Sequence, residues 1–281
     1  MAKAMTKELE MKKAIQEVIK LMMDRVMENV LVKDPFIKEN HRASKPLYAA
    51  LVPDEIFKGS HFERKFVTPF GGAWEKLAIV AANKGLGFGA RAVSITGNIN
   101  RERLRRIQQV LNTLEHPAKG KRVKPNWDGE LKFILSGKST KLTPTTVISD
   151  VYVEDRKENK KYSFELKAPL PNSDQTKVSK EKILKLYSME PMQVNAAYYA
   201  LPYNPYGKRA DYRWGVPMRW FNMREDKAVI IGDEFWEKIG GLGTYKAFIT
   251  AVNEIGKEYK DRIYREFLGI EPPQDVEEGK L

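Results

Sequence analysis

The chain has 281 residues, with 49 lysines and arginines against 37 aspartates and glutamates, and a formal net charge of +12. This positive excess indicates an anionic partner, either nucleic acid or an acidic membrane surface. The absence of cysteine excludes disulfides, thiolate zinc sites and cysteine nucleophiles. The three histidines, His41, His61 and His116, do not stand at metal-ligand spacing, so nothing supports histidine-dependent hydrolysis.

No segment approaches the roughly 18 continuous apolar residues that a membrane span needs. Residues 1–16 are charged throughout and lack the apolar core of a signal peptide. We therefore expect a cytoplasmic protein that does not contact a membrane. The hydrophobic content of 42% is sufficient for a sizeable folded core.

In the first half of the chain, the spacing of apolar residues predicts three helices. A long amphipathic helix is expected over residues 7–32, a second with its body over residues 73–84, and a third over residues 99–116. Residues 34–70 are punctuated by proline and are expected to be mixed, and a basic linker follows at residues 117–129.

In the second half, β-type runs alternate with helical patterns. Strands are expected at 130–137, at 147–154, at 162–168 and within 194–207, and another precedes a short helix within 227–241. Helices are also expected at 178–189 and at 244–269, the latter bent near Gly256. Helices flanking a mixed central β-sheet indicate an α/β (α+β) fold. We predict a single domain over residues 1–270 with an N-terminal helical extension, followed by a disordered acidic tail at 271–281.

The two strands of residues 147–169 carry the strongest signal for function. A charged linker separates them, and a turn between Lys157 and Glu158 would pair Asp150 with Glu165 in an antiparallel hairpin. Glu165 and Lys167 share one face because side chains alternate along a strand. Two carboxylates and an ammonium group would then lie close together, an arrangement that a divalent cation stabilises.

Acid-x-Lys patterns are common in a chain that is 31% charged, and most copies here lie in helical or loop-like sequence. The one serious rival is Glu130-Leu131-Lys132, which begins an apolar run predicted to be a strand. That copy lacks a preceding strand with an aspartate, because a basic linker precedes it. The hairpin of Asp150, Glu165 and Lys167 is therefore the favoured site.

The sequence ISD, followed 14 residues later by ELK, resembles the core of the PD-(D/E)XK nucleases, with Ser149 where the motif has proline. The resemblance implies that Asp150 and Glu165 bind Mg²⁺ together with the main-chain carbonyl of Leu166. It also implies that Lys167 lies beside the attacking water. Glu75 resembles the additional acidic ligand that a preceding helix often provides in this superfamily.

The segments ELKAPLPNSDQTK, AAYYALPYNPYG and GDEFWEKIGGLGTY are similar to type II restriction endonucleases of the TdeIII/MjaII kind. The resemblance implies Mg²⁺-dependent hydrolysis of double-stranded DNA at a short palindromic site, such as GGNCC, leaving 5′-phosphates. It also implies a companion DNA methyltransferase. A homodimer is expected because a two-fold symmetric protein reads a palindrome most simply.

Basic residues near the predicted site are candidates for DNA contacts. Contacts to phosphates would position the duplex and make its binding salt-dependent, whereas base contacts would read the sequence. The candidates for phosphate contacts are Arg101, Arg103, Arg105, Arg106, Lys119, Lys121, Arg122, Lys124, Lys177, Lys180 and Lys182. The candidates for base contacts are Asn204, Lys208, Arg209 and Arg213.

Other functions have weaker support in the sequence. Gly137-Lys138-Ser139 lacks the glycine of a phosphate-binding loop, because Lys132 stands at that position. The glycines of residues 85–90 follow a helix, where a dinucleotide fingerprint would follow a strand. A DNA repair or junction-resolving nuclease, and a non-catalytic DNA-binding protein, remain open as alternatives.

Overall fold

A computed structural model describes residues 2–116 and 122–273, with side chains from Glu8 onward. The chain forms two compact units, one from the residues up to Leu77 and from Lys246, the other from Ala78–Tyr245. Our expectation of a single domain over 1–270 stays a prediction. Among the described residues, no helix has the length and apolarity that crossing a bilayer requires.

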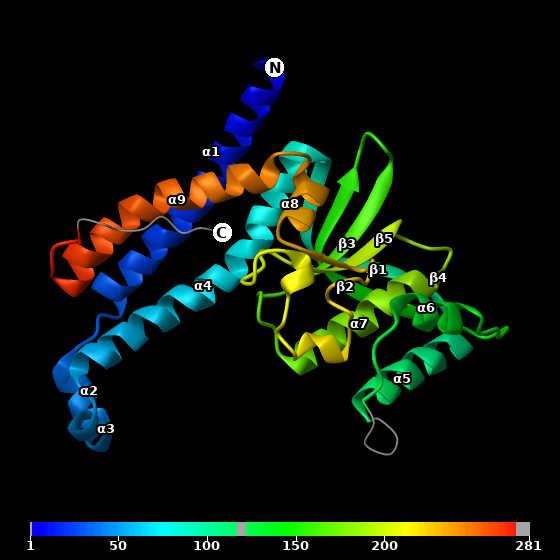
Figure 1. The fold of residues 1–281 in the computed structure, drawn as a ribbon, viewed down its shortest axis with the longest axis horizontal. Helices are drawn as coiled ribbons and strands as arrows, with labels where there is room; N and C mark the ends of the chain where they lie inside the picture. The colour runs from blue at the N-terminus through cyan, green and yellow to red at the C-terminus, as the bar shows by residue number, and fades with distance from the viewer. Residues whose placement is uncertain (1, 117–121, 274–281) are drawn as a thin grey trace. The chain divides into compact units, whose positions relative to one another are not determined.

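The first unit is helical. Its elements are α1 (Ala2–Glu28), which continues as a π-helical turn (Asn29–Lys33), α2 (Lys38–Ser44), α3 (Pro46–Leu51), the first part of α4 (Asp54–Gly85), and α9 (Thr244–Arg262) with a π-helical end (Ile263–Leu268). Helices α1 and α9 lie side by side (Figure 1), joined by the ion pair of Lys12 and Glu254 at 2.9 Å. The predicted helix over 7–32 is confirmed.

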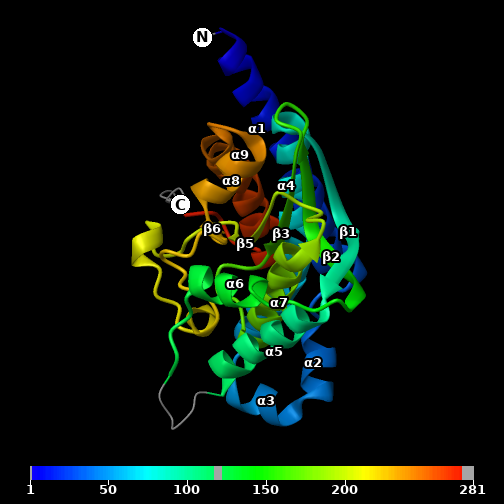
Figure 2. The same ribbon diagram turned by 90° about the vertical axis from the view of Figure 1, so that its right-hand side faces the viewer.

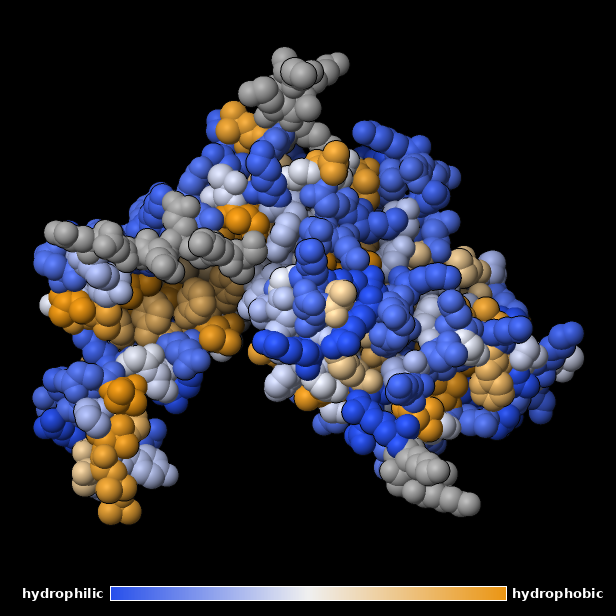
Figure 3. All heavy atoms as spheres, viewed as in Figure 1, coloured by the Kyte–Doolittle hydropathy of each residue, from blue (hydrophilic) through white to orange (hydrophobic). Residues whose placement is uncertain are grey.

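Apolar side chains are exposed on the short helices of this unit. Leu47 is 77% exposed and Leu51 81% exposed, both on α3. Figure 3 shows hydrophobic side chains gathered over α2 and α3. Exposed apolar groups that cluster in this way often mark a contact surface.

The second unit is built on one mixed sheet with the strand order β4-β1-β2-β3-β5-β6. The strands are β1 (Gly87–Asn100), β2 (Leu142–Asp155), β3 (Lys160–Leu166), β4 (Met189–Glu190), β5 (Ala196–Leu201) and β6 (Val229–Ile231). The first four strands in this order pair antiparallel, whereas β3, β5 and β6 pair parallel (Figure 2). The α/β prediction with a mixed sheet and flanking helices is confirmed.

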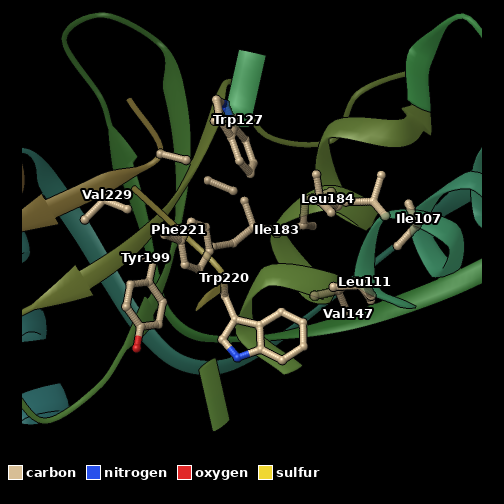
Figure 4. Packing of buried hydrophobic residues seen from close by; sticks show 14 of the residues in the cluster. Ile107, Leu111, Trp127, Val147, Ile183, Leu184, Tyr199, Trp220, Phe221 and Val229 are labelled. Carbon is tan, nitrogen blue, oxygen red and sulfur yellow. The ribbon is translucent and has the colours of Figure 1, made fainter. Parts of the chain in front are cut away.

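Helices cover both faces of this sheet. The helices α5 (Arg101–Glu115), α6 (Trp127–Leu135) and α7 (Ser173–Ser188) pack their apolar side chains with those of the sheet in one core cluster (Figure 4). Phe235 of α8 (Asp233–Gly240) packs edge-on against Phe164 of β3, with ring centroids 5.8 Å apart. Because side chains alternate along β3, Phe164 and Glu165 point to opposite faces, and the α7 face receives the carboxylate.

Several predicted elements differ from the structure. The strand expected at 130–137 is wrong, because those residues belong largely to helix α6, whose N-cap Asn126 accepts a hydrogen bond from the Gly129 N–H. Asn172 caps α7 in the same way, so that helix starts at Ser173 and not at Val178. These side-chain caps decide where each helix begins.

Three other segments also depart from the expectations. Helix α4 starts at Asp54 and runs through Pro69, although this stretch was expected to be mixed. Strand β1 occupies residues over which the sequence predicted no strand. Helix α9 continues through Gly256 with no break there, and the geometry changes to π-helical only from Ile263. The predicted tail lies largely outside the described residues.

A buried ion pair joins α6 and α7. The Lys180 side chain is fully buried, and its Nζ lies 2.5 Å from Glu130 Oε2 and donates a hydrogen bond to the Trp220 carbonyl. Burial lowers the pKa of Lys180, an effect that the Glu130 carboxylate opposes. The expected phosphate contact of Lys180 is therefore wrong, and Glu130 is a structural partner, not a catalytic residue.

Replacing Glu130 by alanine should lower the free energy of unfolding by about 3–5 kcal/mol, because an uncompensated ammonium group would remain buried. Urea unfolding followed by circular dichroism measures this change. The matched control is Asp128→Ala on the same helix, which removes an exposed ion pair with Lys227 and should have little effect. Equal losses in the two variants would contradict a stabilising role of the buried pair.

Candidate active site

The β2–β3 hairpin positions the candidate site. Its ladder runs from Asp155 opposite Lys160 to Val151 opposite Phe164, and a four-residue turn at 156–159 closes it. Asp155 Oδ1 accepts hydrogen bonds from the N–H groups of Lys157 and Glu158 in this turn. The predicted turn and register are confirmed, and one further step in the same register sets position 150 opposite position 165.

Two carboxylates and two ammonium groups meet at this point. Lys167 Nζ forms an ion pair with Asp150 Oδ2 and lies 3.7 Å from Glu165 Oε2. Lys182 Nζ lies 3.0 and 2.9 Å from Glu165 Oε1 and Oε2, and 3.4 Å from Asp150 Oδ1. All four carboxylate oxygens therefore contact an ammonium group.

The groups of this cluster differ in burial. The Glu165 side chain is 1% exposed, whereas those of Asp150, Lys167 and Lys182 are 18%, 20% and 25% exposed. Glu165 Oε2 also accepts a long hydrogen bond of 3.4 Å from Ser179 Oγ of α7. The cluster is thus partly exposed to solvent, with one deeply buried carboxylate.

Lys182 belongs to this cluster, although the sequence predicted a different role for it. It was expected to contact phosphates, but the structure places its ammonium group on the carboxylate pair. Ser179 and Lys182 stand three residues apart on α7 and therefore share one helix face. The helix packs against β2 and β5, so this face lies over the carboxylates. The feature of the sequence that could have indicated this role is that the lysines of α7 follow the ELK segment closely in the chain.

Ser149 stands directly before Asp150 in β2, where the resemblance to the PD-(D/E)XK core would place a proline. The side chain is fully buried, accepts a hydrogen bond from Ser163 Oγ on β3 at 2.7 Å and donates one to the Val151 carbonyl at 2.8 Å. These hydrogen bonds fix the backbone of β2 immediately before Asp150. A proline at this position would restrict the backbone through its ring.

Burial and the neighbouring Asp150 carboxylate raise the pKa of Glu165 from 4.5 to about 7, and Lys167 and Lys182 lower it by a smaller amount. Burial lowers the pKa of Lys182, but Glu165 and Asp150 more than offset this, so that its pKa is raised. Glu165 therefore holds a proton at mildly acidic pH in the absence of any further cation.

The cluster suits a hard divalent cation, because Asp150 and Glu165 offer carboxylate oxygens, whereas the role of the Leu166 carbonyl as a ligand stays a prediction. Over the described part of the chain, no three acidic or histidine side chains are grouped closely enough to hold a metal ion. Glu75 lies on α4 among residues of the first unit, so its role as a ligand stays a prediction.

Most basic residues of α5 are committed to ion pairs within the protein. Arg103 pairs with Glu190 at 2.6 Å, and Arg105 and Arg106 both pair with Glu102. In the same way, Lys177 pairs with Glu115 at 2.6 Å. Arg101, Arg122 and Lys124 are exposed, and Arg105 remains exposed despite its ion pair, whereas Lys119 and Lys121 lie outside the described residues.

The candidate base-reading loop divides into structural and exposed residues. Asn204 accepts a hydrogen bond from the Tyr206 N–H and donates one to the Lys208 carbonyl, which shapes the turn. Arg209 pairs with Glu234 at 3.1 Å and donates to two carbonyls. Lys208 and Arg213 are exposed.

This loop is attached to the segment that follows Lys167. The Tyr212 hydroxyl donates to the Pro169 carbonyl at 2.9 Å, and Trp214 Nε1 donates to the Pro171 carbonyl at 3.0 Å. The exposed Lys208 and Arg213 therefore belong to a loop that is anchored to the residues directly after Lys167.

The pKa of Glu165 leads to a pH dependence of stability that Glu165→Gln should abolish. Between about pH 4.5 and 7, the folded state keeps the Glu165 proton that the unfolded state has lost, so the free energy of unfolding falls as pH rises through this window. Urea unfolding in chelator at several pH values measures this, as the difference between wild type and variant. Parallel curves would contradict the raised pKa.

Comparisons with known proteins identify the family of this chain. The sequence matches the family described as "Type II restriction endonuclease, HinfI" over residues 11–256. The type II restriction enzymes HgiBI and HgiEI of Herpetosiphon aurantiacus are each 27% identical over 228 residues, which cover 80% of this chain and 81% of each relative. A third relative, HgiCII of the same organism, is equally similar. The chain belongs to the HinfI family of type II restriction endonucleases, which are site-specific deoxyribonucleases.

Proposed function

We propose that this restriction endonuclease hydrolyses phosphodiester bonds of double-stranded DNA with Mg²⁺ at a short palindromic site and leaves 5′-phosphates. The observation that carries the proposal is the cluster of Asp150, Glu165 and Lys167 at the end of one hairpin ladder. This arrangement supports a PD-(D/E)XK site. We also propose that the enzyme is of the TdeIII/MjaII kind.

Asp150, Glu165 and the Leu166 carbonyl would hold the metal ion. When bound, Mg²⁺ supplies Lewis-acid polarisation of the phosphate and lowers the pKa of a bound water. Glu165 serves this role as a carboxylate, and its pKa of about 7 means that it loses its proton at mildly alkaline pH, before or as the cation binds.

Lys167 would stabilise the charge of the scissile phosphate. Its backbone N–H donates to the Ala200 carbonyl at 3.0 Å, so β5 fixes the start of the side chain. The ammonium group is 20% exposed and thus reaches the solvent side of the cluster. A cation held in this position acts where negative charge develops in the transition state.

The competing acid-x-Lys copy does not fit this chemistry. Glu130 and Lys132 lie on helix α6, where residues two apart do not share a face. The Glu130 carboxylate also forms the buried ion pair with Lys180. A repair or junction-resolving nuclease would use the same cluster, but the relatives favour restriction.

DNA would be held by the exposed cations, with Arg101, Arg122 and Lys124 on phosphates and Lys208 and Arg213 near the bases. A site such as GGNCC is the first sequence to test. The enzyme would act as a homodimer, which a palindrome favours and the exposed apolar side chains of α3 suit. A companion methyltransferase would protect the host's own sites.

Incubating unmethylated phage DNA with the enzyme should give discrete fragments with Mg²⁺ and none with chelator. Lys167→Ala should reduce the cleavage rate by about 10²–10³-fold, because it removes a cation at the transition-state charge, and Asp150→Ala should abolish cleavage. Lys185→Ala, on α7 outside the cluster, is the matched control. A smear, or cleavage of branched DNA only, would move the function to repair, and fragments that survive both variants would refute the site.

Replacing Arg213 by alanine should weaken DNA binding, measured by fluorescence anisotropy with Ca²⁺ in place of Mg²⁺. If Arg213 contacts a phosphate, the slope of log affinity against log salt should decrease by about one. If it contacts a base, affinity should fall for the cognate site and not for random DNA. Lys246→Ala on the first unit is the control for net charge. Binding equal to that of the control would contradict a role of the loop.

A further inference from the structure

The Lys182 ammonium group occupies the position of a bridging cation between the two carboxylates. It lies within 3.4 Å of three of the four carboxylate oxygens, at 2.9 and 3.0 Å from both oxygens of Glu165 and 3.4 Å from Asp150 Oδ1. Lys167 contacts the remaining oxygen, Asp150 Oδ2. When Glu165 is ionised, the charges of the two carboxylates and the two ammonium groups cancel, and the cluster is neutral without any bound ion.

A divalent cation and this ammonium group would compete for the same oxygens. Mg²⁺ binds carboxylate oxygens at about 2.0–2.1 Å and demands nearly octahedral geometry. Both oxygens of Glu165 and one of Asp150 are already hydrogen-bonded to Lys182, and a metal bound between them would stand beside a positive charge. Binding therefore requires Lys182 to move or to lose these contacts.

Lys182 is better suited to give way than Lys167. The base of Lys167 directly continues β3, and its N–H is hydrogen-bonded to the neighbouring strand. Lys182 reaches the cluster from helix α7 through a long, flexible side chain, and it is 25% exposed, so that its ammonium group can turn to solvent.

We propose that Lys182 is a positioning residue that takes the place of the metal ion in the free enzyme. It holds Asp150 and Glu165 together until a divalent cation displaces it, and it thereby sets the metal affinity of the site. This inference rests on the proposed function, because it presupposes a metal ion bound by the same two carboxylates.

Calorimetric titration of Ca²⁺ into the full-length protein without DNA tests the proposal. Lys182→Gln should bind Ca²⁺ about tenfold more tightly than wild type or better, because a neighbouring cation disfavours binding of positive charge to a carboxylate by this order. Lys182→Arg, which keeps the charge, should bind as wild type does.

Thermal unfolding gives a second readout. In chelator, Lys182→Gln should melt at a lower temperature than wild type, since the carboxylate pair loses its cation. Ca²⁺ should then raise the melting temperature of this variant by more than it raises that of wild type. If Lys182 had a merely structural role, Lys182→Gln would lower the melting temperature equally in chelator and in Ca²⁺, and the affinity for Ca²⁺ would be unchanged.

Lys185→Gln is the matched control. Lys185 stands one turn further along α7, is 27% exposed and pairs with Glu181 at 2.7 Å, so the variant removes the same charge from a similar environment away from the cluster. Equal Ca²⁺ affinities in Lys182→Gln and Lys185→Gln would overturn the inference and leave the metal site standing. Ca²⁺ binding that is the same in wild type and in Asp150→Asn would overturn the metal site and this inference together.

Discussion

The register of the β2–β3 hairpin is the constraint on which the site depends. Side chains alternate with a period of two, so a shift of one residue would send Glu165 to the face occupied by Phe164. The apolar side chains of that other face, packed against α8, hold the register, and the side chain of Asp155 closes the turn. Burial of Phe164 therefore determines the position of the charged cluster.

The charges of the hairpin then determine which side chains must lie near it. Two carboxylates brought together with one of them buried are costly unless cations compensate them. Lys167 directly follows the strand of Glu165, whereas Lys182, 15 residues further along the chain, reaches the cluster from helix α7. The parallel pairing of β3 with β5 requires a crossover, and α7 is that crossover, which places a basic helix over the site.

Three lysines of helix α7 have three different partners and environments. Lys180 is fully buried and pairs with Glu130, Lys182 reaches the carboxylate cluster, and Lys185 pairs with Glu181 near the surface. Lys180 and Lys182, two residues apart, point in different directions around the helix axis, whereas Lys185 lies about one turn beyond Lys182 and binds its own partner. Net positive charge alone therefore overestimates the DNA-binding surface, since several basic residues form ion pairs with carboxylates of the same chain.

The sequence by itself determined the hairpin, its register and the identity of Asp150, Glu165 and Lys167 as one cluster, because local alternation and a short turn fix these relations. It also determined the long N-terminal helix and α5, whose apolar spacing is regular. It misassigned α6, because a short segment with only a few apolar residues suits a strand or a helix equally, and the cap at Asn126 decides between them. Only the tertiary structure assigned Lys180 and Lys182, because their partners lie far away in the chain and are set by how helices pack on the sheet.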